Sequence, residues 1–330
     1  MKRAAVSLSL LLLLSGCGGV QSALDAHGDN AILLKGLIVF VVATCFAVWI
    51  VVMLVLVWSL VRRRDRQAMD DGSLDRRMTI AVSGAVAATA LIISGLTIAS
   101  FYTTRGLDPA RDTSLTIRVR AQQWWWRFIY EDADPARSFQ TANELHIPVG
   151  KDVRVLLESS DVIHSFWVPS LAGKQDLIPG RANVLTFRAE RPGVYRGQCA
   201  EFCGLQHSHM ALFVIAEDEE SYRQWASAQR KEGLEPREPE TAAGKAAFMA
   251  RQCAACHTIR GTEASGITGP DLTHMGSRST IAAGLLENTR GSLAAWIADP
   301  QTLKPGNNMP IVPLSADELR QISAYMGSLK

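Results

Sequence analysis

A loop near position 200 carries side chains that are suited to binding a soft metal ion. It runs from Gly197 to Met210 and contains Cys199, Cys203 and His207 ahead of that methionine. Thiolate, imidazole and thioether are the ligands that favour copper. Two cysteines in one short loop can also bridge two copper ions, each of which then needs a terminal imidazole. His207 supplies one, and His164, just past an apolar run, is a candidate for the second.

Two other interpretations use the same cysteines. Cys199 and Cys203 could form a disulfide, or they could bind tetrahedral zinc together with histidine. Neither gives Met210 a role, because thioether is a poor zinc ligand and prefers copper. The loop and His164 together resemble the binuclear copper (CuA) site of cytochrome c oxidase subunit II. The ligands implied by this resemblance are His164, Cys199, the backbone carbonyl of Glu201, Cys203, His207 and Met210.

A second cofactor motif lies nearer the C-terminus. Cys253-Ala254-Ala255-Cys256-His257 is the attachment motif of c-type haem. The two thiols add across the haem vinyl groups, and the adjacent histidine becomes the proximal iron ligand. The alternatives are a chance match and a zinc knuckle. Zinc lacks ligands here, because no second Cys/His pair follows in the sequence.

The distal haem ligand has three candidates after the attachment motif: Met309, Met275 and His274. Resemblance to class I cytochrome c favours a methionine in a late loop before the last helix, and this matches Met309. Met275 is expected to pack against the haem edge, and an imidazole from His274 would lower the haem potential. The predicted flanking helices are 242–249 and 316–329, with Phe248 and Tyr325 in contact where they cross.

Two long uncharged runs, 36–61 and 78–104, predict transmembrane helices. Each exceeds the ~20 residues that span a bilayer. The short segment between them is rich in arginine, which predicts that it lies in the cytoplasm and that both chain ends lie outside. In many members of the resembling family the second membrane helix carries a glutamate at the entrance of a proton path. The second run here contains no Asp or Glu, so the resemblance implies that protons enter through another residue or another subunit; Asp75, just before the run, is one candidate.

The first residues resemble a bacterial lipoprotein signal. Met1-Lys2-Arg3 and a short apolar core end at Leu14-Ser15-Gly16-Cys17. Residues 1–16 are therefore predicted to be a signal peptide, and Cys17 to carry the lipid. The alternative is an ordinary signal peptide that ends near a cysteine. Cys45 lies within an apolar run and is expected to be an inert thiol.

Residues 105–230 contain short alternating runs separated by turns, which predict a β-sandwich. The resemblance implies a cupredoxin-like sandwich with the copper loop at one end. We place an N-terminal segment with two membrane helices at 17–104, a charged, proline-containing linker at 231–240 and an all-α class I cytochrome c domain at 241–330. The predicted fold class is a multidomain membrane protein with a two-helix transmembrane hairpin, a cupredoxin-like sandwich and a cytochrome c domain.

The resemblance implies roles for two further residues. Trp124 opens the run Trp124-Trp125-Trp126, and its position matches the family's tryptophan that receives the incoming electron, although the family has tyrosine in the middle of this run. The other interpretation of this run is ordinary core packing. The carboxylate of Glu201 matches one that helps to bind magnesium shared with the catalytic subunit. The segment 174–181 matches one that faces that subunit, and its alternative is a charged turn.

The expected function is that of subunit II of a respiratory, proton-translocating cytochrome c oxidase of the caa type. The oxygen site lies in a separate catalytic subunit I, and the donor is a soluble cytochrome c or a similar carrier. A net charge of +2 gives no indication of a nucleic acid partner. The expected location is the bacterial inner membrane, with both metal domains outside. The alternatives are a subunit of a CuA-containing nitric oxide reductase, and a free-standing electron carrier or copper-delivery protein. Nitrous oxide reductase has a similar loop, so the loop alone does not identify the enzyme.

Overall fold

The structure is a computed structural model that describes residues 19–62, 73–107, 112–113 and 115–330. The chain divides into two compact units, one of Ile32–Asp108 and one of Met1–Ala31 with Pro109–Lys330. The predicted signal peptide and Cys17 lie outside the described residues.

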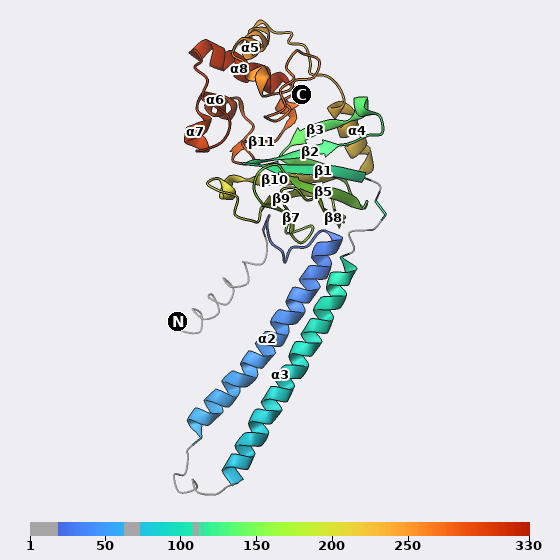
Figure 1. Ribbon diagram of the computed structural model, residues 1–330, viewed down its shortest axis with the longest axis vertical. Helices are drawn as coiled ribbons and strands as arrows, with labels where there is room; N and C mark the ends of the chain where they lie inside the picture. Colours follow the sequence, from blue (N-terminus) through green and yellow to red (C-terminus); the bar gives the residue numbers. More distant parts are fainter. Residues whose placement is uncertain (1–18, 63–72, 108–111, 114) are drawn as a thin grey trace, which may run out of the picture. The chain divides into compact units, whose positions relative to one another are not determined.

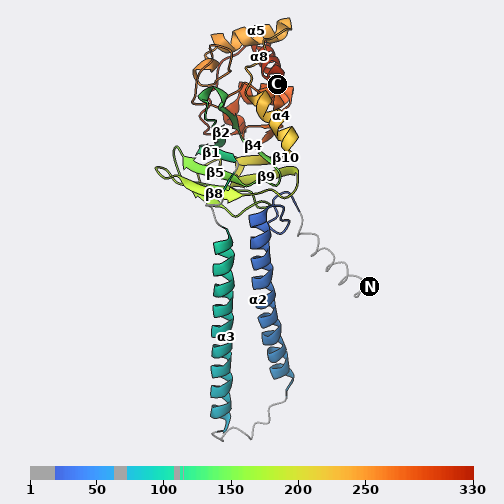
Figure 2. The same cartoon turned by 90° about the vertical axis from the view of Figure 1, so that its right-hand side faces the viewer.

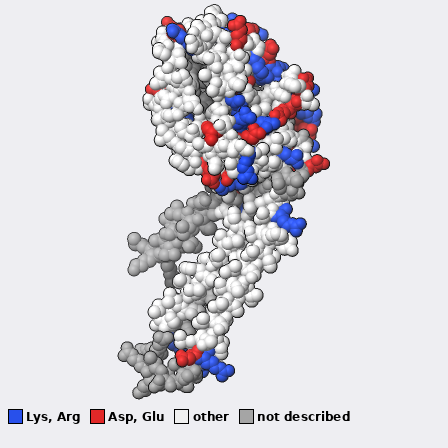
Figure 3. Space-filling model, viewed as in Figure 1, with Lys and Arg blue, Asp and Glu red and all other residues white. Residues whose placement is uncertain are grey.

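Two long apolar helices dominate the smaller unit (Figures 1 and 2): α2 (Asp29–Val61) and α3 (Ser73–Gly106). Both are long and apolar enough, by length and composition, to cross a membrane. Their apolar side chains are largely exposed rather than packed in a protein core, and charged residues are sparse between the helix ends (Figure 3). The two uncharged runs therefore form helices as predicted. Helix α2 begins before the first run and ends with it, whereas α3 extends beyond the second run at both ends.

Two five-stranded sheets form a sandwich in the larger unit. The first has the order β3-β2-β1-β5-β8 and the second β4-β10-β9-β6-β7. In the first sheet the strands are β1 (Leu115–Gln122), β2 (Trp125–Tyr130), β3 (Phe139–Ala142), β5 (Val153–Ser159) and β8 (Asn183–Phe187). In the second they are β4 (Glu144–Pro148), β6 (His164–Trp167), β7 (Gln175–Leu177), β9 (Gly193–Cys199) and β10 (Ala211–Glu217).

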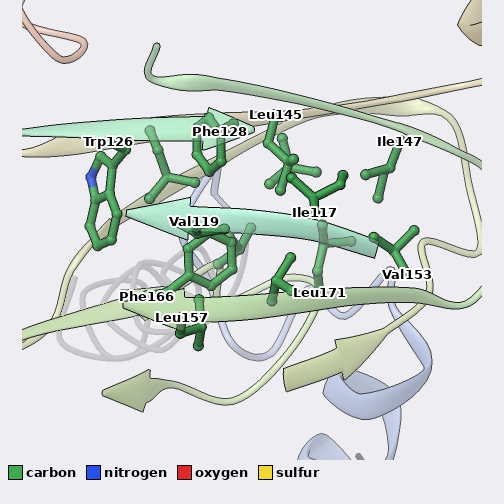
Figure 4. Close-up of a cluster of buried hydrophobic side chains, with 14 of the residues drawn as sticks. Ile117, Val119, Trp126, Phe128, Leu145, Ile147, Val153, Leu157, Phe166 and Leu171 are labelled. Carbon is green, nitrogen blue, oxygen red and sulfur yellow. The ribbon is translucent and has the colours of Figure 1, made fainter. Parts of the chain in front are cut away.

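The sandwich core follows from the alternation along each strand. In β1 the side chains of Ile117, Val119 and Ala121 are buried, whereas the residues between them are half-buried. Successive side chains of a strand point to opposite faces, so one face of β1 enters the core. Figure 4 shows Ile117 and Val119 packed with Phe128 and Phe166. Helix α4 (Glu219–Gln229), capped by Asp218, follows the last strand.

Four helices form the C-terminal domain: α5 (Pro239–Ala250), α6 (Arg290–Ala298), α7 (Pro300–Leu303) and α8 (Ala316–Ser328). A two-stranded ribbon of β11 (Thr280–Ile281) and β12 (Leu286–Glu287) accompanies them. Ser315 begins α8 with a capping box that includes Glu318. The rings of Phe248 and Tyr325 meet edge to face with 6.3 Å between centroids, which confirms the predicted contact between these helices.

The predicted linker is hydrogen-bonded to the cytochrome c domain. The amide of Gly233 donates to the carbonyl of Arg260 at 2.9 Å, and the carbonyl of Lys231 lies 3.2 Å from Nε2 of His274. Helix α5 begins at Pro239, before the predicted end of the segment. These contacts hold the first half of the segment against the domain.

Gly244 is the residue that allows α5 and α8 to cross closely. A Cβ atom at this position would lie 2.1 Å from the carbonyl oxygen of Gln321. We expect Gly244→Ala to destabilise the cytochrome c domain by about 1–3 kcal/mol, because the helices must separate to admit it. Thermal unfolding followed by haem absorbance should show a lower Tm. Gly327→Ala is the control, since a Cβ there meets nothing within 4 Å; equal Tm values for the two variants would contradict the prediction.

Candidate metal centres

Strand pairing brings His164 next to the cysteine loop. Phe166 of β6 pairs with Cys199 of β9, so His164 lies two residues along β6 from this pair. The loop then returns to β10, and the amide of Cys199 donates to the carbonyl of Met210 at 3.0 Å. Residues far apart in sequence thus meet at one end of the second sheet.

All six expected copper ligands converge there. Nδ1 of His164 lies 3.8 Å from Sγ of Cys199, and the sulfurs of Cys199 and Cys203 are 3.7 Å apart. Sγ of Cys203 lies 3.7 Å from Nδ1 of His207 and 3.9 Å from Sδ of Met210. The carbonyl oxygen of Glu201 is 3.2 Å from Sγ of Cys199. The ligand atoms of His164, Cys199 and Cys203 all lie within 4.8 Å of one another.

This donor set fits copper. The sulfur separation of 3.7 Å is far longer than a disulfide bond of ~2.05 Å, and both cysteines are free. Contact with Cys203, and then with His164, lowers the pKa of Cys199, whereas contact with Cys199 and burial raise the pKa of Cys203. The Cys199 sulfur is therefore readily held as thiolate, the form that binds metals. Two sulfurs with an imidazole on each side and a thioether match the ligand preferences of copper.

Residues around the ligands hold them in position. Nε2 of His164 lies 2.9 Å from Oδ1 of Asp161, which orients the ring so that Nδ1 faces the sulfurs. Nε1 of Trp124 and Nε2 of Gln123 donate to the carbonyl of Cys203 at 2.9 and 2.7 Å. Gly204, at φ +109°, allows this close approach, since a Cβ there would lie 3.1 Å from Cζ2 of Trp124. Sequence reasoning assigned no role to Asp161.

The haem attachment motif forms a second site. Cys253 to Ala255 make one turn of 3-10 helix, and His257 follows it. Nδ1 of His257 donates to the carbonyl of Pro270 at 2.8 Å, which leaves Nε2 for iron. Burial lowers the pKa of His257, so the ring is neutral, as a metal ligand must be. A Cβ at Gly269 would lie 2.6 Å from Cε1 of His257, so only glycine fits against the ring.

An apolar cavity with two adjoining parts lies beside this histidine and suits a haem. Both parts are lined by Cys253, His257, Trp296 and Met309. The amide of Met309 donates to Oδ1 of Asn307, and its carbonyl accepts from Nε2 of Gln301, so the loop that carries the thioether is braced. Of the other two candidates, Met275 is buried and lines one part of the cavity, with its sulfur 3.6 Å from Nη1 of Arg278. His274 lies against Lys231 instead and does not line the cavity.

Part of the cavity wall comes from the sandwich. The residues of the sandwich that line it come from the end of β1, the turn into β2, the start of β2 and the position before β4: Gln122, Gln123, Trp124, Trp125 and Asn143. Trp124 therefore touches both sites, because it lines the haem cavity and bonds to the carbonyl of Cys203. Sequence reasoning assigned roles to neither Gln123 nor Asn143; only the packing of the two domains places them here.

The carboxylate of Glu201 forms an ion pair with the ammonium of Lys174. The Lys174 ammonium also lies 3.7 Å from Asp176. Contact with Glu201 raises the pKa of Lys174. The carboxylate proposed for magnesium thus has a cation partner in this chain.

These features define a membrane-anchored electron carrier with a copper sandwich and a cytochrome c domain. Comparisons with known families agree. Residues 133–217 match the family described as cytochrome c oxidase subunit II, periplasmic domain, and residues 241–330 match the cytochrome c family.

The chain is also similar to individual proteins of this family. The chain is 34% identical to cytochrome c oxidase subunit 2 of Alkalihalophilus pseudofirmus, covering 97% of this chain and 95% of the relative. It is 30% identical to the protein of the same description from Bacillus subtilis, over 66% of this chain and 63% of that one. A solved structure, the periplasmic domain of subunit II of cytochrome oxidase of Bradyrhizobium japonicum, is 30% identical with a TM-score of 0.35, covering 36% of this chain and 96% of that one.

The chain belongs to the cytochrome c oxidase subunit II family. It is a subunit of a haem–copper oxidase and carries a copper site and a cytochrome c domain, as expected from the sequence.

Proposed function

We propose that this chain receives electrons at its own haem c and passes them through Trp124 to the copper pair and then to the catalytic subunit. When bound, haem c and the copper pair supply the redox chemistry. One observation supports the route through Trp124: this residue lines the haem cavity and also donates to the carbonyl of Cys203 at 2.9 Å. The indole thus bridges the two sites through one side chain and one hydrogen bond.

The chain's residues would hold the two groups as follows. His164, Cys199, Cys203, His207, Met210 and the carbonyl of Glu201 would bind the copper pair. Cys253 and Cys256 would carry the haem covalently, with His257 and Met309 as its axial ligands. The cavity lining supports Met309, because Met309 lines both parts of the cavity beside His257, whereas Met275 lines only one.

Magnesium would require Glu201 to change partners. Its carboxylate belongs to a residue of the copper loop and is paired with Lys174. We propose that it binds magnesium only where the catalytic subunit supplies further oxygen ligands, since Mg²⁺ demands near-octahedral oxygen coordination. The cation would then replace the ammonium of Lys174 beside this carboxylate.

The proposed location is the inner membrane of a bacterium. Two apolar helices with an arginine-rich connection favour a cytoplasmic connection and an outer face for both metal domains. The proposed partners are catalytic subunit I and other oxidase subunits, with a soluble cytochrome c or similar carrier as donor. Lipid on Cys17 would add a second anchor beside the helices.

Purification of the chain from native membranes tests the oxidase assignment. We expect a catalytic haem–copper subunit to accompany it, and the complex to consume oxygen when haem c is reduced. Consumption of nitric oxide in place of oxygen would support the nitric oxide reductase alternative. Recovery of the chain alone would support a free-standing carrier.

Replacement of Trp124 should slow electron transfer from haem to copper, because its indole lies on the proposed route. In Trp124→Phe the bond to the Cys203 carbonyl is lost, and we expect the transfer to slow by about tenfold or more, which is a rise of ~1.4 kcal/mol in the barrier. The rate is measured after rapid photoreduction of haem c in the purified oxidase.

Trp125→Phe is the matched control. Trp125 also lines the cavity, but its indole contacts the guanidinium of Arg127, 5.0 Å from the ring centroid, rather than the copper loop. It should transfer electrons at nearly the wild-type rate. Equal rates in Trp124→Phe and wild type would exclude the proposed route.

A further inference from the structure

The cytochrome c domain places a buried lysine into the sandwich. The side chain of Lys304 is 2% exposed. Its ammonium donates to the carbonyls of Trp124 and His209, both at 2.8 Å, and to that of Ala282 at 3.0 Å. The first two carbonyls belong to the sandwich, and the third belongs to the lysine's own domain.

This geometry uses the full donor capacity of the group. An ammonium has three protons to donate, and Lys304 has three carbonyl acceptors. Burial lowers the pKa of Lys304 to about 7, so the cation is costly to hold in this position. A buried charge persists only where such contacts offset its desolvation. If the domains separated, two of the three contacts would be lost.

The sandwich places a buried carboxylate into the cytochrome c domain in return. Glu144 of β4 is 5% exposed. Its Oε1 accepts from the amide and the hydroxyl of Ser279 at 2.7 and 2.6 Å, and from the amide of Thr280 at 3.3 Å. Charge-assisted bonds of this kind are stronger than neutral ones. Each domain therefore contributes one buried charge that is satisfied mainly by polar groups of the other.

The two residues after Lys304 make neutral contacts with the sandwich, near Trp124. Nε2 of Gln206, in the copper loop, donates to the carbonyl of Pro305 at 2.9 Å. A Cβ at Gly306 would lie 3.6 Å from Cη2 of Trp124, so the backbone beside Lys304 packs on the indole. Trp124 is consequently only 8% exposed.

We propose that Lys304 and Glu144 are reciprocal anchors that hold the cytochrome c domain in one fixed position over Trp124. They are positioning residues for electron transfer, and this role rests on the proposed function. A single electron moves; what the haem loses the copper pair gains, and no bond in this chain forms or breaks. Because the domain covers Trp124, an outside donor reduces haem c and has no access to the indole.

The wild-type oxidase provides the first test. A domain held in place transfers its electron without moving, so the rate from haem to copper should not change as glycerol or sucrose raises the viscosity. A tethered domain that must first swing into place would slow in proportion to viscosity. That result would overturn the proposal while leaving the proposed function intact. No transfer from haem to copper at any viscosity would instead overturn the proposed function.

Variants at the two anchors provide the second test. In Lys304→Met and in Glu144→Ala we expect the transfer rate to fall and to become dependent on viscosity, because loss of a charged contact weakens docking by about tenfold or more. Glu144→Gln keeps an acceptor oxygen and should recover much of the rate. Lys245→Met is the control, since Lys245 pairs with Glu235 at 2.7 Å, away from the sandwich.

Two measurements separate positioning from folding. The haem c spectrum and potential and the copper spectrum should match wild type in each variant. Hydrogen exchange should rise at 279–284 and around Gln206 in Lys304→Met, whether or not copper is loaded. If Lys304→Met and Glu144→Ala both showed the same electron-transfer rate and the same hydrogen exchange as wild type, the proposal would be overturned. If a variant loses a cofactor, the exchange data and the wild-type viscosity series still decide.

Discussion

Replacement of Cys203 by serine should abolish the binuclear copper signal while haem c stays attached. Sγ of Cys203 lies close to three other expected ligands: it is 3.7 Å from Sγ of Cys199 and Nδ1 of His207 and 3.9 Å from Sδ of Met210. A hydroxyl is a poor ligand for copper compared with thiolate, so the variant would lack one of the two sulfurs expected to hold the copper pair. The mixed-valence spectrum of the purified subunit measures this, and copper analysis gives the metal content.

Cys45→Ser serves as the control for this prediction. Cys45 is also a free thiol, but it lies on α2. The variant should keep the wild-type copper signal. The haem band tests that the Cys203 variant is folded, since Cys253 and Cys256 are unchanged. A two-copper signal that survives in Cys203→Ser would show that the ligand assignment is wrong.

Replacement of Met309 by leucine should remove the thioether-to-iron absorption and lower the haem potential. Met309 lines both parts of the cavity beside His257. Leucine is similar in volume but has no donor atom, so the haem iron would lose the second of its two expected protein ligands. Axial ligands tune haem potentials over about 0.8 V, and we expect a fall on the order of 0.2 V. Redox titration of haem c measures the change.

Met275→Leu is the matched control. The sulfur of Met275 contacts Arg278 at 3.6 Å, and its side chain packs with the core residues of the domain. The volume-conserving change should cost less than ~1.5 kcal/mol and leave the potential nearly unchanged. The opposite pattern, in which Met275→Leu loses the band and Met309→Leu keeps it, would exchange the roles of the two methionines.

Much of the fold was predictable because its signals are local. Uncharged runs longer than a bilayer predicted α2 and α3, and strict alternation predicted β1. The predicted start of the last helix at residue 316 agrees with α8, which Ser315 caps. Helix α6 was missed: it is only nine residues long, and only Leu293 is buried along it, so its periodic signal is weak.

The sequence by itself determined the chemistry of the two sites. Cys199, Cys203, His207 and Met210 lie within one short loop, and Cys253, Cys256 and His257 lie within another. Ligand identity depends on residue type, and when ligands are close in sequence a single turn of backbone can bring them together. Both motifs could therefore be recognised without any tertiary contact.

Only the tertiary structure decided how the sites are joined. Lys304 lies 180 residues from Trp124, and Ser279 lies 135 residues from Glu144. In the sequence Lys304, Glu144 and Ser279 are ordinary charged or polar residues, of types that are most often exposed to solvent. Burial between two domains makes these charges significant, because a charge removed from water must find partners across the interface. Such partners are set by the packing of whole domains, so no local pattern records them.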